Sequence, residues 1–235
     1  MIAVFVVFLL LSVVTIIIYF NMNDGSVKKI LNNEKLDNIC KDLSFNSIIC
    51  NEIMHDMQLK DVKVEVNADK KSDMSYYSSI TNKIYLSDKE GTNKSFARVL
   101  FISHECAHAR QNKAFLNWSL TISAINFVFT IFILLIMFLN LLPETGYLYI
   151  LLISFLLNFF AYFARNIIES DASYMAIGIA RKYLQKHITI QNLEEIMDEY
   201  SRIISFGFST FQLKLIKTNL ICMFILITYM MVKIF

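Results

Sequence analysis

Two histidines and a glutamate in the middle of the chain have the types and spacing of a metal site. His104, Glu105 and His108 form an H-E-x-x-H pattern within a run whose apolar residues recur at steps of three and four, which is typical of a helix. Residues four apart lie about one turn from each other on a helix, so both imidazoles can bind one tetrahedral Zn²⁺. Glu105 is rotated by roughly 100° from His104, beside the metal but not on it. We therefore expect one zinc ion per chain, held by His104 and His108, with Glu105 as the general base that takes a proton from the metal-bound water.

The composition of the whole chain and its apolar runs are typical of a membrane protein. Of the 235 residues, 56% are hydrophobic, and only one is Pro and five are Gly, which is far more apolar than soluble proteins are. Apolar runs of about 20 residues predict membrane spans. Such runs predict an anchor at residues 1–20, a hairpin of two spans at 118–164 and a last span at 218–235. The anchor has no small-residue cleavage site after it, which indicates that it is retained. The last run is short and carries Lys233, so an amphipathic or re-entrant tail is the alternative there.

Basic residues are distributed unevenly between the segments that join these spans. Of the 22 Lys and Arg, 14 lie in residues 21–116 and seven in residues 164–217. By the positive-inside rule, both polar segments, 21–117 and 165–217, face the cytoplasm. The net charge of +2 is too small to indicate nucleic-acid binding. The expected partners are therefore the lipid bilayer and a protein or peptide substrate near the membrane, and no nucleic acid.

A third metal ligand has to come from elsewhere in the chain, because a catalytic zinc usually has three protein ligands and leaves its fourth position to water. This ligand must lie on the same membrane face as the motif, and the chain returns to that face after residue 164. Glu169 follows within an apparent helix and is the predicted third ligand, with a solvated helix residue as the alternative. Asp171 is predicted to accept a hydrogen bond from the second ring nitrogen of a ligand histidine, with direct metal binding as its alternative. The remaining candidates are His55, Glu52 and His187.

The two polar segments predict a mostly helical domain with a small β-hairpin. Residues 26–57 have a helical rhythm that breaks near Ser44. Residues 62–66 alternate with period two, and residues 83–86 are a second β-rich run, so we expect these two strands to pair as a hairpin. Further helices are expected at residues 166–184 and 193–204.

Four short runs along the chain are more specific in combination than the pentapeptide alone. They are Ile84-Tyr85-Leu86-Ser87, Ser95-Phe96-Ala97, the pentapeptide with the following Ala109-Arg110-Gln111, and Glu169-Ser170-Asp171-Ala172-Ser173. Together they resemble the YugP-like family of neutral zinc metallopeptidases of bacterial membranes, over about residues 50–185. The resemblance implies a gluzincin-type site, related in plan to the HtpX-type membrane proteases, with the same ligands and base as above. The chain departs from the family at Ala107, where Gly is usual, and at residues 75–79, where the family has an Asp-His-Tyr-Asp-Pro-like stretch.

These observations predict a mainly α-helical membrane protein with about four transmembrane helices and a cytoplasmic zinc-metallopeptidase domain, multi-pass in the bacterial cell membrane. The predicted activity is that of a zinc-dependent endopeptidase, a hydrolase acting on membrane-proximal substrates. The alternatives are a catalytically inactive zinc-binding scaffold or regulator, a small-ion transporter, and a peptidase with its site outside the cell. A transporter is disfavoured because the predicted spans contain almost no ionisable residues. The oxyanion donor is left open between a tyrosine such as Tyr174 and His187.

Overall fold

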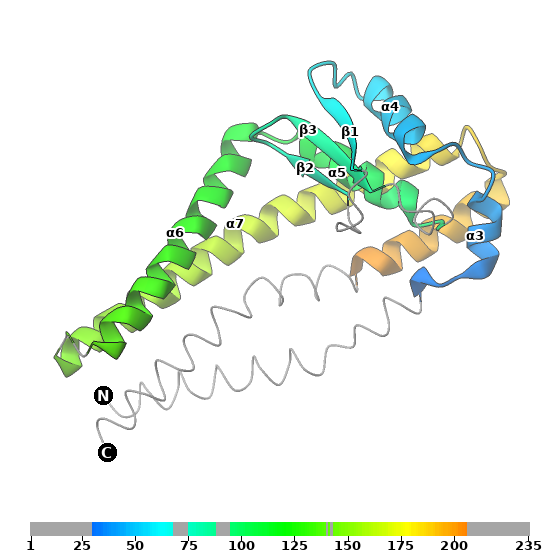
Figure 1. The fold of residues 1–235 in the computed structure, drawn as a ribbon. Coiled ribbons are helices and arrows are strands. Elements are labelled where there is room, and N and C mark those ends of the chain that lie inside the picture. Colours follow the sequence, from blue (N-terminus) through cyan, green and yellow to red (C-terminus); the bar gives the residue numbers. More distant parts are fainter. Residues whose placement is uncertain (1–29, 68–74, 88–94, 140, 142, 206–235) are drawn as a thin grey trace. The chain divides into compact units, whose positions relative to one another are not determined.

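The computed structural model describes residues 30–67, 75–87, 95–139, 141 and 143–205 of the chain (Figure 1). The chain divides into two compact units. The first, here called the helix–sheet unit, contains Asp24–Asn117 and Ile167–Phe208; the second, the hairpin unit, contains Met1–Asn23, Trp118–Asn166 and Ser209–Phe235. The predicted anchor at 1–20 and the predicted last span at 218–235 lie outside the described residues.

The helix–sheet unit begins with two short helices joined by a turn. Helix α3 covers Glu34–Cys40 and is capped by Asn33, whose side-chain oxygen accepts a backbone N–H of the first turn. Helix α4 covers Asn46–Asp56. The break predicted near Ser44 is therefore confirmed. The buried Arg98 stabilises this turn, because its guanidinium donates to main-chain carbonyls of Cys40, Leu43 and Ser44.

A three-stranded sheet follows, in the order β1-β3-β2. β1 is Lys63–Asn67, β2 is Tyr76–Ser78 and β3 is Lys83–Ser87. The two predicted strands are thus confirmed as strands, but the prediction that they pair as a hairpin is wrong, since β1 and β3 are parallel. Parallel neighbours need a longer connection than a tight turn, and here that connection contains β2. The hairpin of this sheet is formed by β2 and β3, which are antiparallel, and its turn ends at Asn82 with a positive φ of 53°.

The rest of the described chain is mostly helical. α5 covers Arg98–Arg110, α6 covers Lys113–Phe138 and α7 covers Glu144–Leu184. Residues 190–205 are also helical, in agreement with the helix predicted at 193–204. α5 carries the H-E-x-x-H pattern, and α7 carries Glu169 and Asp171. The site residues predicted from the sequence therefore lie on two helices of the helix–sheet unit.

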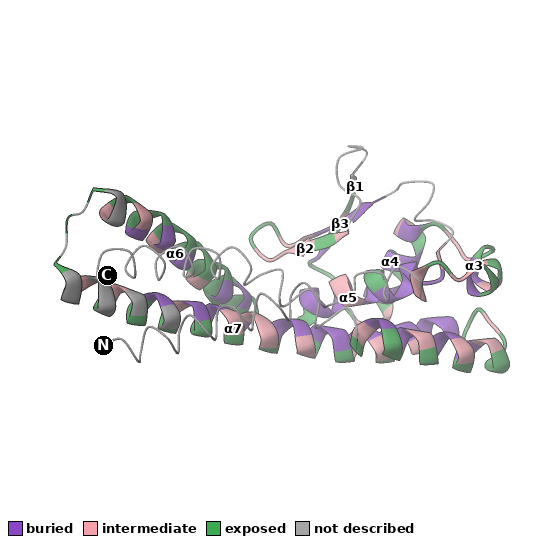
Figure 2. Ribbon diagram, turned by 90° about the horizontal axis from the view of Figure 1, so that it is seen from below, coloured by how far each residue is buried: buried purple, intermediate pink, exposed green. Residues whose placement is uncertain are grey.

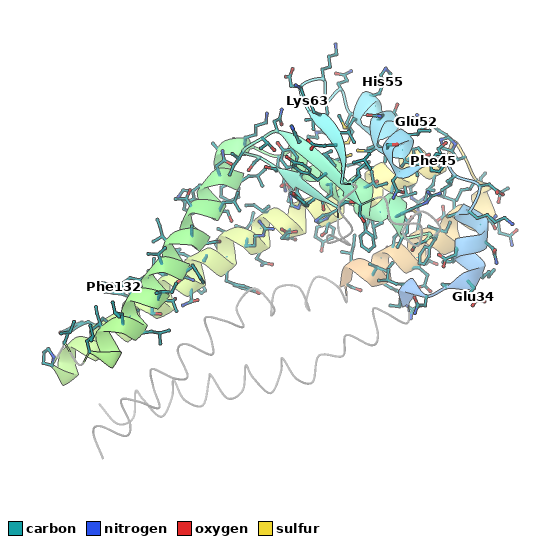
Figure 3. All side chains as sticks on the ribbon, viewed as in Figure 1. Glu34, Phe45, Glu52, His55, Lys63 and Phe132 are labelled. Atoms are coloured by element: carbon teal, nitrogen blue, oxygen red, sulfur yellow. The ribbon has the colours of Figure 1, made fainter. Side chains whose placement is uncertain are left out.

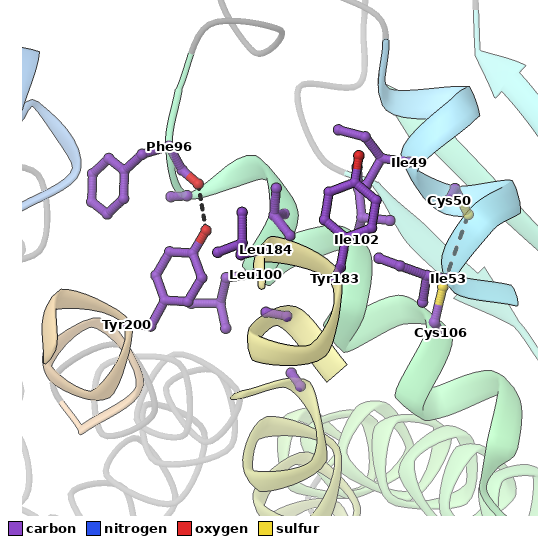
Figure 4. Close-up of a cluster of buried hydrophobic side chains, with 14 of the residues drawn as sticks. Ile49, Cys50, Ile53, Phe96, Leu100, Ile102, Cys106, Tyr183, Leu184 and Tyr200 are labelled. Atoms are coloured by element: carbon purple, nitrogen blue, oxygen red, sulfur yellow. Dashed lines mark hydrogen bonds between the residues drawn. The ribbon is translucent and has the colours of Figure 1, made fainter. Parts of the chain in front are cut away.

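The core of the helix–sheet unit fixes α5 against its neighbours. Apolar side chains of α4, α5, the end of α7 and residues 190–205 pack into one cluster (Figure 4). The fully buried Tyr200 donates its hydroxyl hydrogen to the main-chain oxygen of Phe96, with an O–O distance of 2.6 Å. The free thiols of Cys50 and Cys106 meet across α4 and α5 at 3.9 Å. α5 is therefore held along one side by the core, which leaves its other side for the site.

The hairpin unit contains the greater part of α6 and the first half of α7. Helices Lys113–Ile136 and Leu152–Leu184 are long and apolar enough to cross a membrane, judged by length and composition. Large apolar side chains such as Phe132, labelled in Figure 3, are exposed on α6. Between the two helices, the buried Asn126 amide donates to Asn158 Oδ1 at 3.1 Å. A hydrogen bond between buried amides of this kind holds two apolar helices together.

Candidate metal centre

Helix α5 presents its two histidines on the side that its core contacts leave free. Ile102 and Cys106 are buried in the core, whereas His104 is partly exposed and His108 is buried with 9% of its surface exposed. The four-residue spacing places both imidazoles over successive turns of this side. Their rings lie with centroids 4.6 Å apart and nearly perpendicular planes, so the two Nε2 atoms converge on one point.

Helix α7 brings Glu169 to the same point. A stripe of residues at four-residue steps faces the interior of the unit, and all of its members are almost fully buried: Ile168, Ala172, Ala176 and Ala180. Figure 2 shows this buried stripe along α7. The small alanines let the helix backbone approach its neighbours closely. Glu169 lies next to this stripe and is itself only 6% exposed, so its carboxylate is held inside the unit.

The three ligand atoms form a compact triangle. His108 Nε2 lies 3.1 Å from His104 Nε2, and Glu169 Oε2 lies 3.2 Å from His104 Nε2 and 3.4 Å from His108 Nε2. Ligand atoms each about 2.0–2.1 Å from a tetrahedral zinc ion are separated by about 3.4 Å from one another. The observed triangle therefore fits one face of such a coordination sphere, with two nitrogens and one carboxylate oxygen. The structure brings together the residues that the sequence analysis selected as ligands.

Charge and burial act in opposite directions on the pKa values of His108, which is in the triangle, and of Glu105, which lies beside it. Burial lowers the pKa of His108, but its hydrogen bond to Glu169 and the charges of Glu169 and Glu105 outweigh that effect and raise it above the usual value. Burial raises the pKa of Glu105, against the charges of the two histidines and a backbone hydrogen bond. That bond comes from the N–H of Tyr77 in β2, which donates to Glu105 Oε2 at 2.7 Å. Glu105 is thus held between the metal triangle and a strand.

Gln111 is a residue of the site that the sequence analysis missed. It follows the last turn of α5, and its Oε1 lies 2.9 Å from His108 Nδ1. Its Nε2 donates to the main-chain oxygen of Ile168 and to Asp171 Oδ2, both at 2.8 Å. His108 Nδ1 thus meets Gln111 rather than Asp171, and that Asp171 accepts from a ligand histidine stays a prediction for His104. The signal available in the sequence was the position of Gln111, three residues after His108 at the end of a helix.

The remaining candidates lie elsewhere in the described structure. Glu52 and His55, labelled on α4 in Figure 3, are not in the triangle, and Glu52 Oε2 is 3.3 Å from His187 Nε2. His187 therefore pairs with Glu52 and not with a residue of the metal triangle. Tyr174 is 73% exposed on α7. Neither of the two residues named as possible oxyanion donors is brought to the three ligand atoms by a described contact.

The comparisons with known proteins bear on this arrangement through one family. Among curated proteins and among solved structures, none matches the chain. The family whose description is "Putative neutral zinc metallopeptidase" matches residues 5–232, which is nearly the whole chain. A match of that extent includes the H-E-x-x-H helix and the helix that carries Glu169. The chain with this triangle of two histidines and a glutamate belongs to that zinc metallopeptidase family.

Proposed function

We propose that the protein is a membrane-anchored, zinc-dependent endopeptidase that hydrolyses peptide bonds of protein or peptide substrates near the membrane. The observation that carries the proposal is the triangle of His104, His108 and Glu169 with sides of 3.1–3.4 Å, beside a glutamate that is not part of it. Membership of the zinc metallopeptidase family supports the same reaction class. His104, His108 and Glu169 would hold one zinc ion, which supplies a Lewis acid for the scissile carbonyl and for a water molecule.

Glu105 is the group of this chain that moves the proton. Its position next to His104 on α5, outside the ligand triangle, is that of a general base. The carboxylate of Glu105 takes a proton from the attacking water and passes it to the nitrogen of the leaving amine. Burial raises the pKa of Glu105 from its usual value, which favours a carboxyl group that can both accept and return a proton.

The edge of the sheet offers a place for an extended substrate. β2 is at one edge of the described sheet, and α5 lies against it through the Tyr77–Glu105 hydrogen bond. A peptide that adds to this edge as a further strand would run past Glu105. Main-chain hydrogen bonds give such binding its affinity without requiring a particular side chain, which suits an endopeptidase with extended substrates.

Membrane anchoring and orientation are part of the proposal. The two helices long and apolar enough to span a bilayer support an integral membrane protein. The basic residues of the polar segments support a site that faces the cytoplasm of a bacterial cell. In this proposal the substrate approaches along the lipid surface to a site whose ligands lie on α5 and on the polar second half of α7.

The competing function is a zinc-binding scaffold without activity. The decisive experiment compares the wild-type chain with Glu105→Gln, both purified with their membrane segments in lipid nanodiscs. Zinc content is measured by elemental analysis, and cleavage is measured on a mixture of unfolded peptides by mass spectrometry. We expect equal zinc in both proteins and cleavage by the wild type alone, with Glu52→Gln on α4 as the active control. A zinc-loaded wild type that cleaves no peptide would instead establish the scaffold.

A further inference from the structure

The side-chain amide of Gln111 connects the two helices of the metal triangle. Its oxygen faces His108 on α5, and its nitrogen faces two oxygens of α7, namely the carbonyl of Ile168 and the carboxylate of Asp171. All three contacts are between 2.8 and 2.9 Å. The backbone of Gln111 is itself held, because its N–H bonds to the carbonyls of the last turn of α5. The amide therefore starts from a fixed point and reaches both helices.

The partners on α7 determine which way this amide points. A main-chain carbonyl and a carboxylate only accept hydrogen bonds, so the NH₂ end of Gln111 must face Ile168 and Asp171. The oxygen end then faces His108, and an amide oxygen can only accept. Nδ1 of His108 must consequently carry the ring hydrogen, which leaves the lone pair of Nε2 free at the corner of the triangle. The orientation follows from the hydrogen-bonding capacity of four groups rather than from any one of them.

The same amide also fixes the position of the third ligand. Ile168 is the residue before Glu169, so a hydrogen bond to its carbonyl holds the backbone of α7 one residue away from the carboxylate of the triangle. Asp171 adds a charged acceptor to the same NH₂ group. Gln111 thus acts on His108 through one end and on the backbone next to Glu169 through the other.

We propose that Gln111 is a positioning residue that couples the ring orientation of His108 to the placement of Glu169, and that Asp171 affects the metal only through Gln111. The inference rests on the proposed zinc centre, and it assigns to one amide the alignment of two of the three ligands. Because both functions pass through a single side chain, substitutions at Gln111 and Asp171 are expected to be non-additive.

The experiment measures the affinity of the full-length chain in nanodiscs for Zn²⁺ alone, by competition with a chromogenic chelator. Gln111→Met, which keeps size and loses all three hydrogen bonds, should weaken zinc binding about 10- to 100-fold. Gln111→Glu keeps an acceptor for His108 but places a second negative charge next to Asp171. This variant should therefore bind zinc no more tightly than Gln111→Met. In Asp171→Asn, the amide oxygen of the substituted residue can still accept a hydrogen bond from Gln111. The affinity of this variant for zinc should fall by less than about threefold. The exposed Gln185→Met is the matched control and should bind as the wild type does.

The paired variant makes the test independent of simple damage to the fold. In Gln111→Glu/Asp171→Asn, the new asparagine can donate to the new glutamate, and the charge repulsion is gone. We expect this pair to recover most of the affinity that Gln111→Glu alone loses. The fold-loss of zinc affinity in the pair is compared with the product of the fold-losses in Gln111→Glu and Asp171→Asn. If the two are equal, Asp171 acts independently of Gln111 and the proposal is overturned. Substitution of Co²⁺ for Zn²⁺ gives a second readout, because the visible spectrum should lose its tetrahedral form in Gln111→Met and in Gln111→Glu and regain it in the pair.

Failure of this inference is distinguishable from failure of the proposed function. Wild-type affinity in Gln111→Met, together with peptide cleavage by the wild type, would overturn the positioning role and leave the peptidase intact. The expected pattern of affinities in a chain that cleaves nothing would keep the positioning role and remove the peptidase. A wild-type chain that does not bind zinc would overturn both.

Discussion

Replacement of Glu169 by Gln tests the third corner of the metal triangle with the smallest change of shape. The carboxylate oxygen lies 3.2 and 3.4 Å from the two histidine Nε2 atoms and is almost fully buried. An amide at this position keeps the volume of the side chain but removes its negative charge. The zinc ion would then have two neutral imidazoles and no charged ligand from the triangle. We expect the metal-free protein to keep its fold and its affinity for zinc to be strongly reduced.

The size of the loss can be estimated from the number of ligands. Four-ligand structural zinc sites bind with about 10–16 kcal/mol, so an equal share is about 2.5–4 kcal/mol for each ligand. At about 1.4 kcal/mol for each factor of ten, removal of one ligand corresponds to about 100- to 1000-fold weaker binding. The charge of Glu169 and its low exposure place this residue toward the upper end of that range.

The assay combines a zinc titration with thermal unfolding. A ligand that binds only the folded chain at 100 times its dissociation constant stabilises it by about 2.7 kcal/mol. The wild type should therefore show a higher Tm with zinc than without, whereas Glu169→Gln should show the same Tm in both conditions. Glu194→Gln, at an exposed ion pair with Arg181, is the control and should retain the zinc-dependent shift. Zinc affinity of Glu169→Gln within about threefold of the wild type would refute the reasoning that Glu169 is a ligand.

Three further outcomes are expected. Glu105→Gln should reduce kcat by about 10²- to 10⁴-fold with unchanged zinc content, measured by single-turnover peptide cleavage, because only proton transfer is removed. Tyr200→Phe should lower the free energy of unfolding by about 1–3 kcal/mol in denaturant titrations, since a buried main-chain carbonyl loses its donor; an unchanged value would show that water replaces the hydroxyl. Cysteines introduced one at a time at Asn67 and Gln191, in a chain that lacks Cys222 and keeps the buried Cys40, Cys50 and Cys106, should resist an impermeant thiol reagent in intact cells, and labelling of both would reverse the proposed topology.

The parts of the site that the sequence predicts best depend on local spacing or on chain direction. The two histidines are four residues apart on one helix, so their convergence needs no knowledge of the rest of the fold. Glu169 was predicted from a topological argument, namely that an apolar hairpin returns the chain to the face it left. The structure places its carboxylate at the histidines, as that argument requires.

The parts that could not be predicted depend on contacts between distant segments. The strands at 63–67 and 83–87 have the same composition whether they pair in parallel or as a hairpin, and the three residues of β2 are too few for a periodic pattern. Gln111 is next to the motif in sequence, but its function depends on two acceptors of α7 that lie about 60 residues further along the chain. Only tertiary structure shows that Asp171 meets this amide rather than His108.

The position of β2 connects the sheet to the chemistry of Glu105. Because β2 is at the edge of the described sheet, one side of the strand has no neighbouring strand there, and the N–H of Tyr77 donates on that side to Glu105 Oε2 of α5. A donor at this distance stabilises the ionised carboxylate and opposes the effect of burial on the pKa of Glu105. A peptide that pairs with β2 would compete for the same N–H. Loss of this donor would leave burial less opposed and raise the pKa of Glu105, so the hydrogen bond from Tyr77 is the contact through which the proposed strand pairing would act on the base.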